Sequence, residues 1–174
     1  MHQLFLLRHA KAEPGTNNIS DHERALTGSG VRDAGKIAET MRKAGLAPEV
    51  VLVSTALRTR QTLEALENGS VWDEWPNIDA LPQLYMATLP QLLNTVRGLP
   101  ETVRSALIIG HNPGIHELAL RLCAAGHGDT FNPRLAEGYP TATLTEFLVA
   151  GSWRAAGEDT TSLKRLVLAR EQNP

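Results

Sequence analysis

The sequence has little cysteine, few aromatic residues and no long apolar run. Only one of the 174 residues is cysteine and 5% are aromatic, so no disulfide within the chain and no cysteine-rich zinc site is available. The longest apolar stretches have four residues, against the ~20 that span a bilayer. The first residues lack the basic leader and small-residue cleavage site of a signal peptide. We therefore expect a cytoplasmic protein with no membrane partner.

Charge of one sign is also lacking. With 17 Lys and Arg against 19 Asp and Glu the formal net charge is −2, which provides no general attraction for nucleic acid. Any recognition of phosphate must then be local. A chain of this length is expected to form one domain over residues 1–174 and to bury roughly 70% of the surface that its unfolded form exposes. The oligomeric state is left open by the sequence.

Three short apolar runs, at residues 50–53, 4–7 and 106–109, have no polar alternation. Such runs are typical of strands buried on both faces of a sheet. Between them lie segments with helical periodicity, which predicts an α/β fold around a mostly parallel sheet. We expect helices over about 27–44, 55–68, 89–98 and 113–124, and further strands at 77–80, 144–149 and 163–169.

Local signals indicate where these helices begin. Thr27 is a suitable N-cap for the first helix, and Ser54 with the following threonine for the second. Asn112 followed by Pro113 predicts a cap with proline in the first helical position. The polar segment 126–142 is expected to be a long functional loop. Trp72, Trp75 and Trp153 are expected to be packing or strand-edge residues rather than a platform for a ligand.

Unusual polar residues follow all three buried strands. The first strand leads to Arg8 and His9, the third to His111, and the second to Ser54 with Arg58 in the next helical turn. In open α/β sheets the ligand crevice lies beyond the carboxyl ends of the strands. A single Arg-His pair would be interpreted as a surface ion pair or an ordinary buried histidine, but three such strand ends indicate one phosphoryl site.

Arg58 adds to this argument because a cation in a first helical turn opposes the helix dipole, at a cost of roughly 0.3–1 kcal/mol unless an anion is near. We therefore expect a negative group beside it. The start of the helix after Asn112 is likewise expected to favour an anion through its free backbone N–H groups.

Other chemistries are less well supported. A metal site could draw on His9, His111, His116 or His127, but His111 and His116 lack the i, i+4 spacing and nearby arginines would repel a cation. Cys123 lies in an apolar helical segment, which favours a buried inert thiol over a nucleophile. No metal and no cofactor are expected.

Four blocks in order resemble the histidine phosphatase superfamily, which also contains the cofactor-dependent phosphoglycerate mutases. They are LLRHAKA at 6–12, RALT at 24–27, LVS at 52–54 with RTRQT at 58–62, and IIGHNP at 108–113. In length and in these blocks the chain is most similar to the short SixA-like phosphohistidine phosphatases.

The resemblance implies a three-layer α/β/α sandwich of the phosphoglycerate mutase type, without the large helical cap of longer relatives. It implies that His9 takes the phosphoryl group covalently while Arg8, Arg58 and His111 hold it. Arg24 and Asn112 are further candidates for binding the phosphate.

One position departs from the family. Larger members have a carboxylic acid that protonates the leaving oxygen, where this chain has Gln83. Asp21 is a candidate for proton transfer or for orienting an arginine, and a plain surface carboxylate is an equal alternative. We expect a metal-independent phosphatase acting on phosphohistidine of a protein. The alternatives are hydrolysis of small phosphate esters and a phosphate-binding module without turnover.

Overall fold

The computed structural model describes residues 1–123 and 133–172, and a single six-stranded sheet runs through them in the order β3-β2-β4-β1-β5-β6. The strands are β1 (His2–Arg8), β2 (Val50–Ser54), β3 (Asn77–Leu81), β4 (Ser105–Gly110), β5 (Thr143–Val149) and β6 (Thr161–Leu168). β3, β2, β4 and β1 run parallel to one another, whereas β5 pairs antiparallel with both β1 and β6. The predicted mostly parallel sheet is confirmed.

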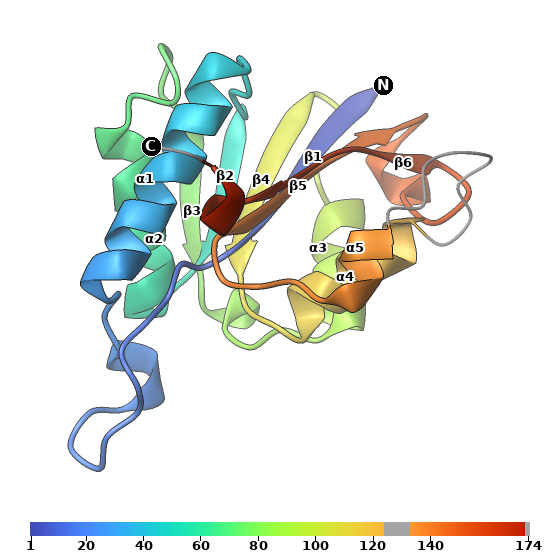
Figure 1. Ribbon diagram of the computed structural model, residues 1–174. Helices are drawn as coiled ribbons and strands as arrows, with labels where there is room; N and C mark the ends of the chain where they lie inside the picture. The colour runs from blue at the N-terminus through green and yellow to red at the C-terminus, as the bar shows by residue number, and fades with distance from the viewer. Residues whose placement is uncertain (124–132, 173–174) are drawn as a thin grey trace.

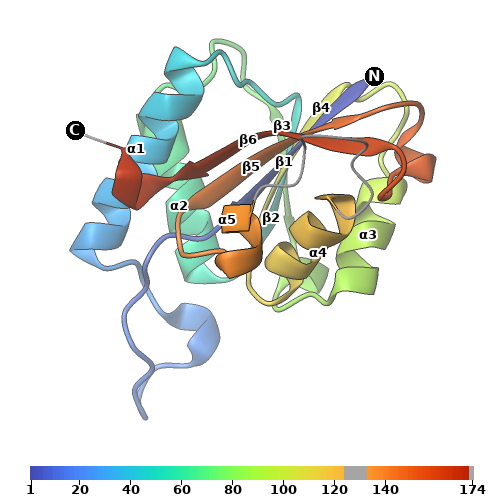
Figure 2. The same ribbon diagram turned by 45° about the vertical axis from the view of Figure 1, so that its right-hand side comes forward.

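Helices cover both faces of the sheet (Figures 1 and 2). On one face α1 (Gly28–Lys43) and α2 (Leu57–Asn68) pack over Phe5 and Leu7 of β1. On the other, α3 (Leu89–Arg97) and α4 (Gly114–Cys123) pack over Leu4 and Leu6, and the short α5 (Pro133–Glu137) joins them. All four β1 side chains are fully buried, which is why this strand shows no polar alternation. The three-layer α/β/α prediction is confirmed, and the described residues contain no large helical cap.

Two of the expected helix starts are observed. Thr27 caps α1 by accepting a hydrogen bond at Oγ1 from the Gly30 N–H at 2.9 Å. At α3 the Thr88 N–H donates to Oε1 of Gln91 at 2.8 Å, as in a capping box. These caps depend only on residues three apart, so local sequence is enough to predict them.

The other two helices begin within two residues of the expected positions, but their predicted caps are wrong. The N-cap of α2 is Ala56, whose side chain has no hydrogen-bonding group. The Ser54 hydroxyl lies before the cap position, where it meets a ring nitrogen of His111 at 2.7 Å and the Ala56 N–H at 3.4 Å. α4 starts at Gly114, after Pro113 rather than with it. Asn112 is not available as a cap because its side-chain N–H donates to the carbonyl of Tyr139 at 2.9 Å.

One further expectation changes. The predicted loop 126–142 includes α5, while residues 126–132 lie outside the described part of the chain. Trp72 and Trp153 are buried as expected, whereas Trp75 is 69% exposed and lies just before the edge strand β3, with its ring edge-on to that of Trp72. Over residues 1–123 and 133–172, no helix is long and apolar enough to cross a membrane.

Candidate active site

The carboxyl ends of β1, β2 and β4 meet at one edge of the sheet, beside the segment between β1 and α1 that projects from the body (blue in Figures 1 and 2). A cavity of about 410 Å³ lies there. Its charged side chains are four basic groups and one carboxylate. The full lining comprises Arg8, His9, Lys11, Ala12, Asp21, Arg24, Arg58, Met86, His111, Asn112 and Thr141. All seven residues that the sequence predicted as catalytic or phosphate-binding line this cavity, whereas Ser54 does not.

His9 directly follows β1 and is only 8% exposed. Its ring Nδ1 lies 2.7 Å from the carbonyl oxygen of Ala10, which can only accept a hydrogen bond. Nδ1 must therefore hold the proton of the neutral ring. The other nitrogen, Nε2, then has a free electron pair, and it accepts a bond from Nε of Arg58 at 3.3 Å.

The surroundings also keep the His9 ring neutral. The pKa of His9 is lowered to about 4, with burial as the largest cause; the charges of Arg58, Arg8 and Arg24 add to it, while the bond to Ala10 acts in the opposite direction. At pH 7 the ring is therefore uncharged. A neutral imidazole with its electron pair on Nε2 is a competent nucleophile.

Arg58 connects the two histidines. Its side chain is nearly fully buried, with Nε toward His9 and Nη2 at 3.3 Å from Nδ1 of His111. Nη1 donates to the Asp21 carbonyl at 2.6 Å, and Nη2 lies 3.1 Å from Oδ2 of the same residue. The anion that we expected near Arg58 is therefore present in the protein itself, and the position of this cation at a helix start does not by itself require phosphate.

His111 is oriented by a residue on each side. Because Arg58 can only donate, Nδ1 of His111 must accept, so that Nε2 of the neutral ring holds the proton and donates to Oγ of Ser54 at 2.7 Å. The pKa of His111 is lowered to about 3, with burial as the largest cause; the adjacent His9 and Arg58 add to it, while Asp21 acts in the opposite direction. The two histidine rings lie 5.3 Å apart. Both rings are neutral at pH 7.

Asp21 lies in the short helix η1 (Asp21–Glu23), and its carboxylate accepts from three side chains. Tyr85 donates to Oδ2 at 2.5 Å, Arg24 to Oδ1 at 2.9 Å, and Arg58 is the third donor. The bond from Tyr85 is the largest cause that lowers the pKa of Asp21 to about 2, with Arg58 and Arg24 adding to it. Asp21 is therefore charged in the unliganded site and holds both arginines in place.

Tyr85 is a site residue that the sequence did not identify. Its ring packs edge-on against His111 at 5.4 Å and against His22 at 4.9 Å. No motif marked it, because a tyrosine 64 positions from Asp21 shows no local pattern. Only the folded chain places it beside that carboxylate.

Arg8 and Asn112 share one acceptor. Each donates to the carbonyl oxygen of Tyr139 at 2.9 Å. Nε of Arg8 and Oδ1 of Asn112 are buried without a hydrogen-bond partner among the described residues. Arg24 donates through Nη1 to the Glu13 carbonyl at 2.7 Å. An unpaired buried N–H on a cation is a ready donor to an anion in the cavity.

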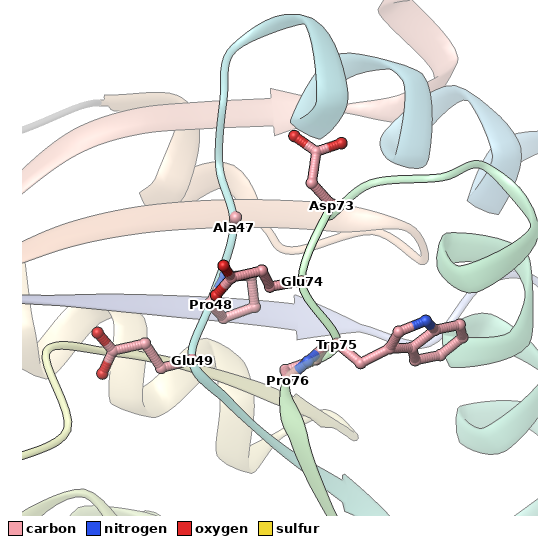
Figure 3. A pocket seen from close by; sticks show the side chains of 7 residues that line it. All are labelled: Ala47, Pro48, Glu49, Asp73, Glu74, Trp75 and Pro76. Carbon is pink, nitrogen blue, oxygen red and sulfur yellow. The ribbon is translucent and has the colours of Figure 1, made fainter.

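A larger cavity of about 500 Å³ lies at the opposite edge of the sheet, before β2 and β3 (Figure 3). Its charged side chains are Glu49, Asp73 and Glu74, which would repel a phosphate. Figure 3 also shows that the side chains diverge, with Trp75 directed away from Glu49. The basic cavity is therefore the better candidate for phosphoryl chemistry.

The structure also bears on the alternative chemistries. No group of three or more metal-binding side chains occurs within residues 1–123 and 133–172. His116 hydrogen-bonds the carbonyl of Leu135 at 2.8 Å, and His127 lies outside the described residues. Cys123 is buried, and burial raises the pKa of its thiol to about 11, as expected for an inert thiol.

Known proteins resemble this chain over most of its length. No family model matches it. The protein ML1117 of Mycobacterium leprae is 31% identical over 153 residues, which cover 85% of this chain and 90% of that protein. The phosphohistidine phosphatase SixA of Escherichia coli is 33% identical over 129 residues, covering 70% of this chain and 74% of SixA.

Among solved structures, a Nakamurella multipartitia protein described provisionally as SixA superposes with a TM-score of 0.80. It is 27% identical, and the match covers 95% of each chain. Together with the sequence relatives, this likeness in fold establishes the family: the chain belongs to the histidine phosphatase superfamily and resembles its short SixA-like members.

Proposed function

We propose that this chain is a metal-independent phosphatase in which Nε2 of His9 takes the phosphoryl group, and that its substrate is phosphohistidine on a protein. The observation that carries the proposal is the hydrogen bond from Nδ1 of His9 to the Ala10 carbonyl, because it leaves the electron pair on the nitrogen that faces Arg58. The low pKa of His9 keeps that pair available at neutral pH.

The basic side chains provide the binding energy for the phosphoryl group. Nε of Arg8 is buried without a partner in the described chain, and Arg58 presents N–H groups between the two histidines. Arg24 and Lys11 add two further positive charges to the same cavity. Preorganised donors of this kind stabilise the charge on the equatorial oxygens of a phosphoryl transfer.

The reaction has two transfers. In the first, a bond forms between Nε2 of His9 and phosphorus while the bond from phosphorus to the leaving nitrogen breaks; that nitrogen keeps the electron pair, and the leaving imidazole takes one proton from solvent. In the second, water attacks phosphorus, the bond to Nε2 breaks, and the pair returns to His9. The proton released by water goes to solvent, and inorganic phosphate leaves.

The residues at the site favour a substrate whose leaving group needs no general acid. Gln83 is exposed and does not line the cavity, and Asp21 is deprotonated in the unliganded site. An imidazole is protonated readily, whereas an alkoxide needs a positioned acid. Phosphohistidine therefore suits this site better than phosphoserine or a sugar phosphate. The similarity to the Escherichia coli phosphohistidine phosphatase SixA supports the same substrate.

The test is a comparison of kcat/KM across substrates whose leaving groups differ in pKa: a phosphohistidine protein, phenyl phosphate and phosphoserine, each with and without a chelator. We expect kcat/KM to fall in that order and to be unaffected by the chelator. Brief reaction with labelled substrate and an alkaline quench should leave an acid-labile label on the protein. His9→Asn should remove this label, whereas His116→Asn, which changes a histidine bonded to Leu135 outside the cavity, should retain it.

Two results would replace the proposal. Equal kcat/KM for phenyl phosphate and phosphoserine would show that a general acid assists, and small phosphate esters would then be the favoured substrates. Tight binding of phosphate with no turnover of any substrate would show a binding module instead.

A further inference from the structure

Met86 is an unusual residue at the mouth of the candidate active site. It follows the short helix η2 (Pro82–Leu84) by two positions, and its φ of 50° lies in the left-handed region. Its side chain is 47% exposed and lines the same cavity as His9 and Arg58. Apart from Ala12, every other lining residue has a polar or charged side chain.

The neighbours of Met86 hold its backbone in this conformation. On one side, the Tyr85 N–H donates to the Pro82 carbonyl at 3.0 Å and its hydroxyl to Asp21 at 2.5 Å. On the other side, Ala87 is buried against α4, where a Cβ on Gly114 would lie 2.0 Å from the Ala87 carbonyl oxygen. The turn is therefore fixed from both ends.

Glycine is the residue that adopts a positive φ without a steric penalty, whereas a methionine there is strained. Nothing in the packing of the turn requires a long side chain at this position, because nearly half of the Met86 side chain contacts solvent. A strained residue at a functional site is commonly there for what its side chain contacts. Here the apolar side chain of Met86 lines a cavity whose other residues are almost all polar or charged.

We infer that Met86 is a specificity-determining residue that packs against the leaving group and favours a leaving group with a flat aromatic ring over one without a ring. The inference rests on the proposed function, in which the phosphoryl group lies against His9 and the leaving group points toward the mouth. A thioether side chain is flexible and makes favourable contacts with aromatic rings. The imidazole of phosphohistidine and the ring of an aryl phosphate are such groups.

The experiment compares two small phosphoramidates that share a P–N bond. In 1-phosphoimidazole the leaving group has a ring for Met86 to contact, whereas in phosphoramidate it is ammonia. The variants are Met86→Ala, which keeps the Cβ and its strain, and Met86→Gly, which removes both. A contact of this size is typically worth about tenfold in kcat/KM.

We expect both variants to lose about tenfold in kcat/KM for 1-phosphoimidazole and to stay within about twofold of the unchanged protein for phosphoramidate. Met86→Leu should restore most of the loss. Met86→Gly should also unfold at a higher temperature than Met86→Ala, because it relieves the positive φ.

Equal effects on the two substrates, or none on either, would refute the role of Met86 while the unchanged protein still turned both over. A loss in Met86→Gly that Met86→Ala does not share would assign the effect to backbone mobility and would also refute it. If the unchanged protein hydrolysed neither substrate, the proposed function itself would fail, and this inference with it.

Discussion

The two buried histidines should make the protein lose stability as the pH falls through the mildly acidic range. The folded-state pKa of His9 is about 4 and that of His111 about 3, against 6.5 for an unperturbed histidine. Between pH 6.5 and 4 the unfolded chain therefore binds protons that the folded chain does not. The free energy of unfolding is greatest above pH 6.5 and falls as the pH decreases through this range.

The size of the effect follows from linkage. Between pH 7 and pH 4.5, a histidine whose pKa drops from 6.5 to about 4 on folding reduces the free energy of unfolding by about 2 kcal/mol. His111 should contribute a loss of similar size, so the pair would reduce it by about 4–5 kcal/mol. Asp21, with a pKa near 2, titrates below this range. The total is a large part of the ~5–15 kcal/mol that stabilises an ordinary domain.

The assay is urea unfolding at pH 7.0 and pH 4.5, followed by the fluorescence of the buried Trp72 and Trp153. His9→Asn, which removes one of the two groups, should lose only about half as much free energy of unfolding between these pH values as the unchanged protein. His116→Asn, which alters a histidine outside the cavity, is the matched control and should lose as much as the unchanged protein. An unchanged protein equally stable at both pH values would refute the reasoning, as would a His9→Asn variant with the full loss.

The remaining predictions concern the supports of the site. Gly114→Ala would bring a methyl group to 2.0 Å from the Ala87 carbonyl oxygen and should lower the free energy of unfolding by about 1–3 kcal/mol. Gly35→Ala is its control, because no atom lies within 4 Å of the added methyl group and this helical position should gain up to about 1 kcal/mol in the free energy of unfolding. Urea unfolding measures both variants, and a Gly114→Ala variant as stable as the unchanged protein would contradict the packing argument. Tyr85→Phe removes the largest cause of the low pKa of Asp21, so a carboxyl carbon NMR titration should show that pKa rising toward 3.8; an unchanged value would show that the arginines alone set it.

Much of the site could be predicted because its residues lie beside strong local patterns. Arg8 with His9, and His111, directly follow strands whose apolar runs are unmistakable, and parallel strands end at one edge of a sheet. Arg58 was noticed for opposing a helix dipole, although the anion beside it proved to be Asp21. In these cases a local signal and one topological rule were enough.

The contacts that tune the site could not be predicted from the sequence. Ser54 had the pattern of a helix cap, yet its hydroxyl pairs with His111, 57 positions away. Asn112 had the same pattern, yet its side chain bonds the carbonyl of Tyr139. In each case a local cap competed with a distant partner, and the distant partner prevailed.

The sequence by itself determined the order of strands and helices along the chain and which polar side chains follow the buried strands. Apolar periodicity and strand ends are local properties of the chain. Only the tertiary structure decided which nitrogen of His9 holds its proton, what neutralises Arg58, that Tyr85 bonds Asp21, and that Met86 lines the cavity. Hydrogen-bond partners and burial depend on atoms far apart in the chain. The chemistry of the histidines therefore appears only when the fold has brought those atoms together.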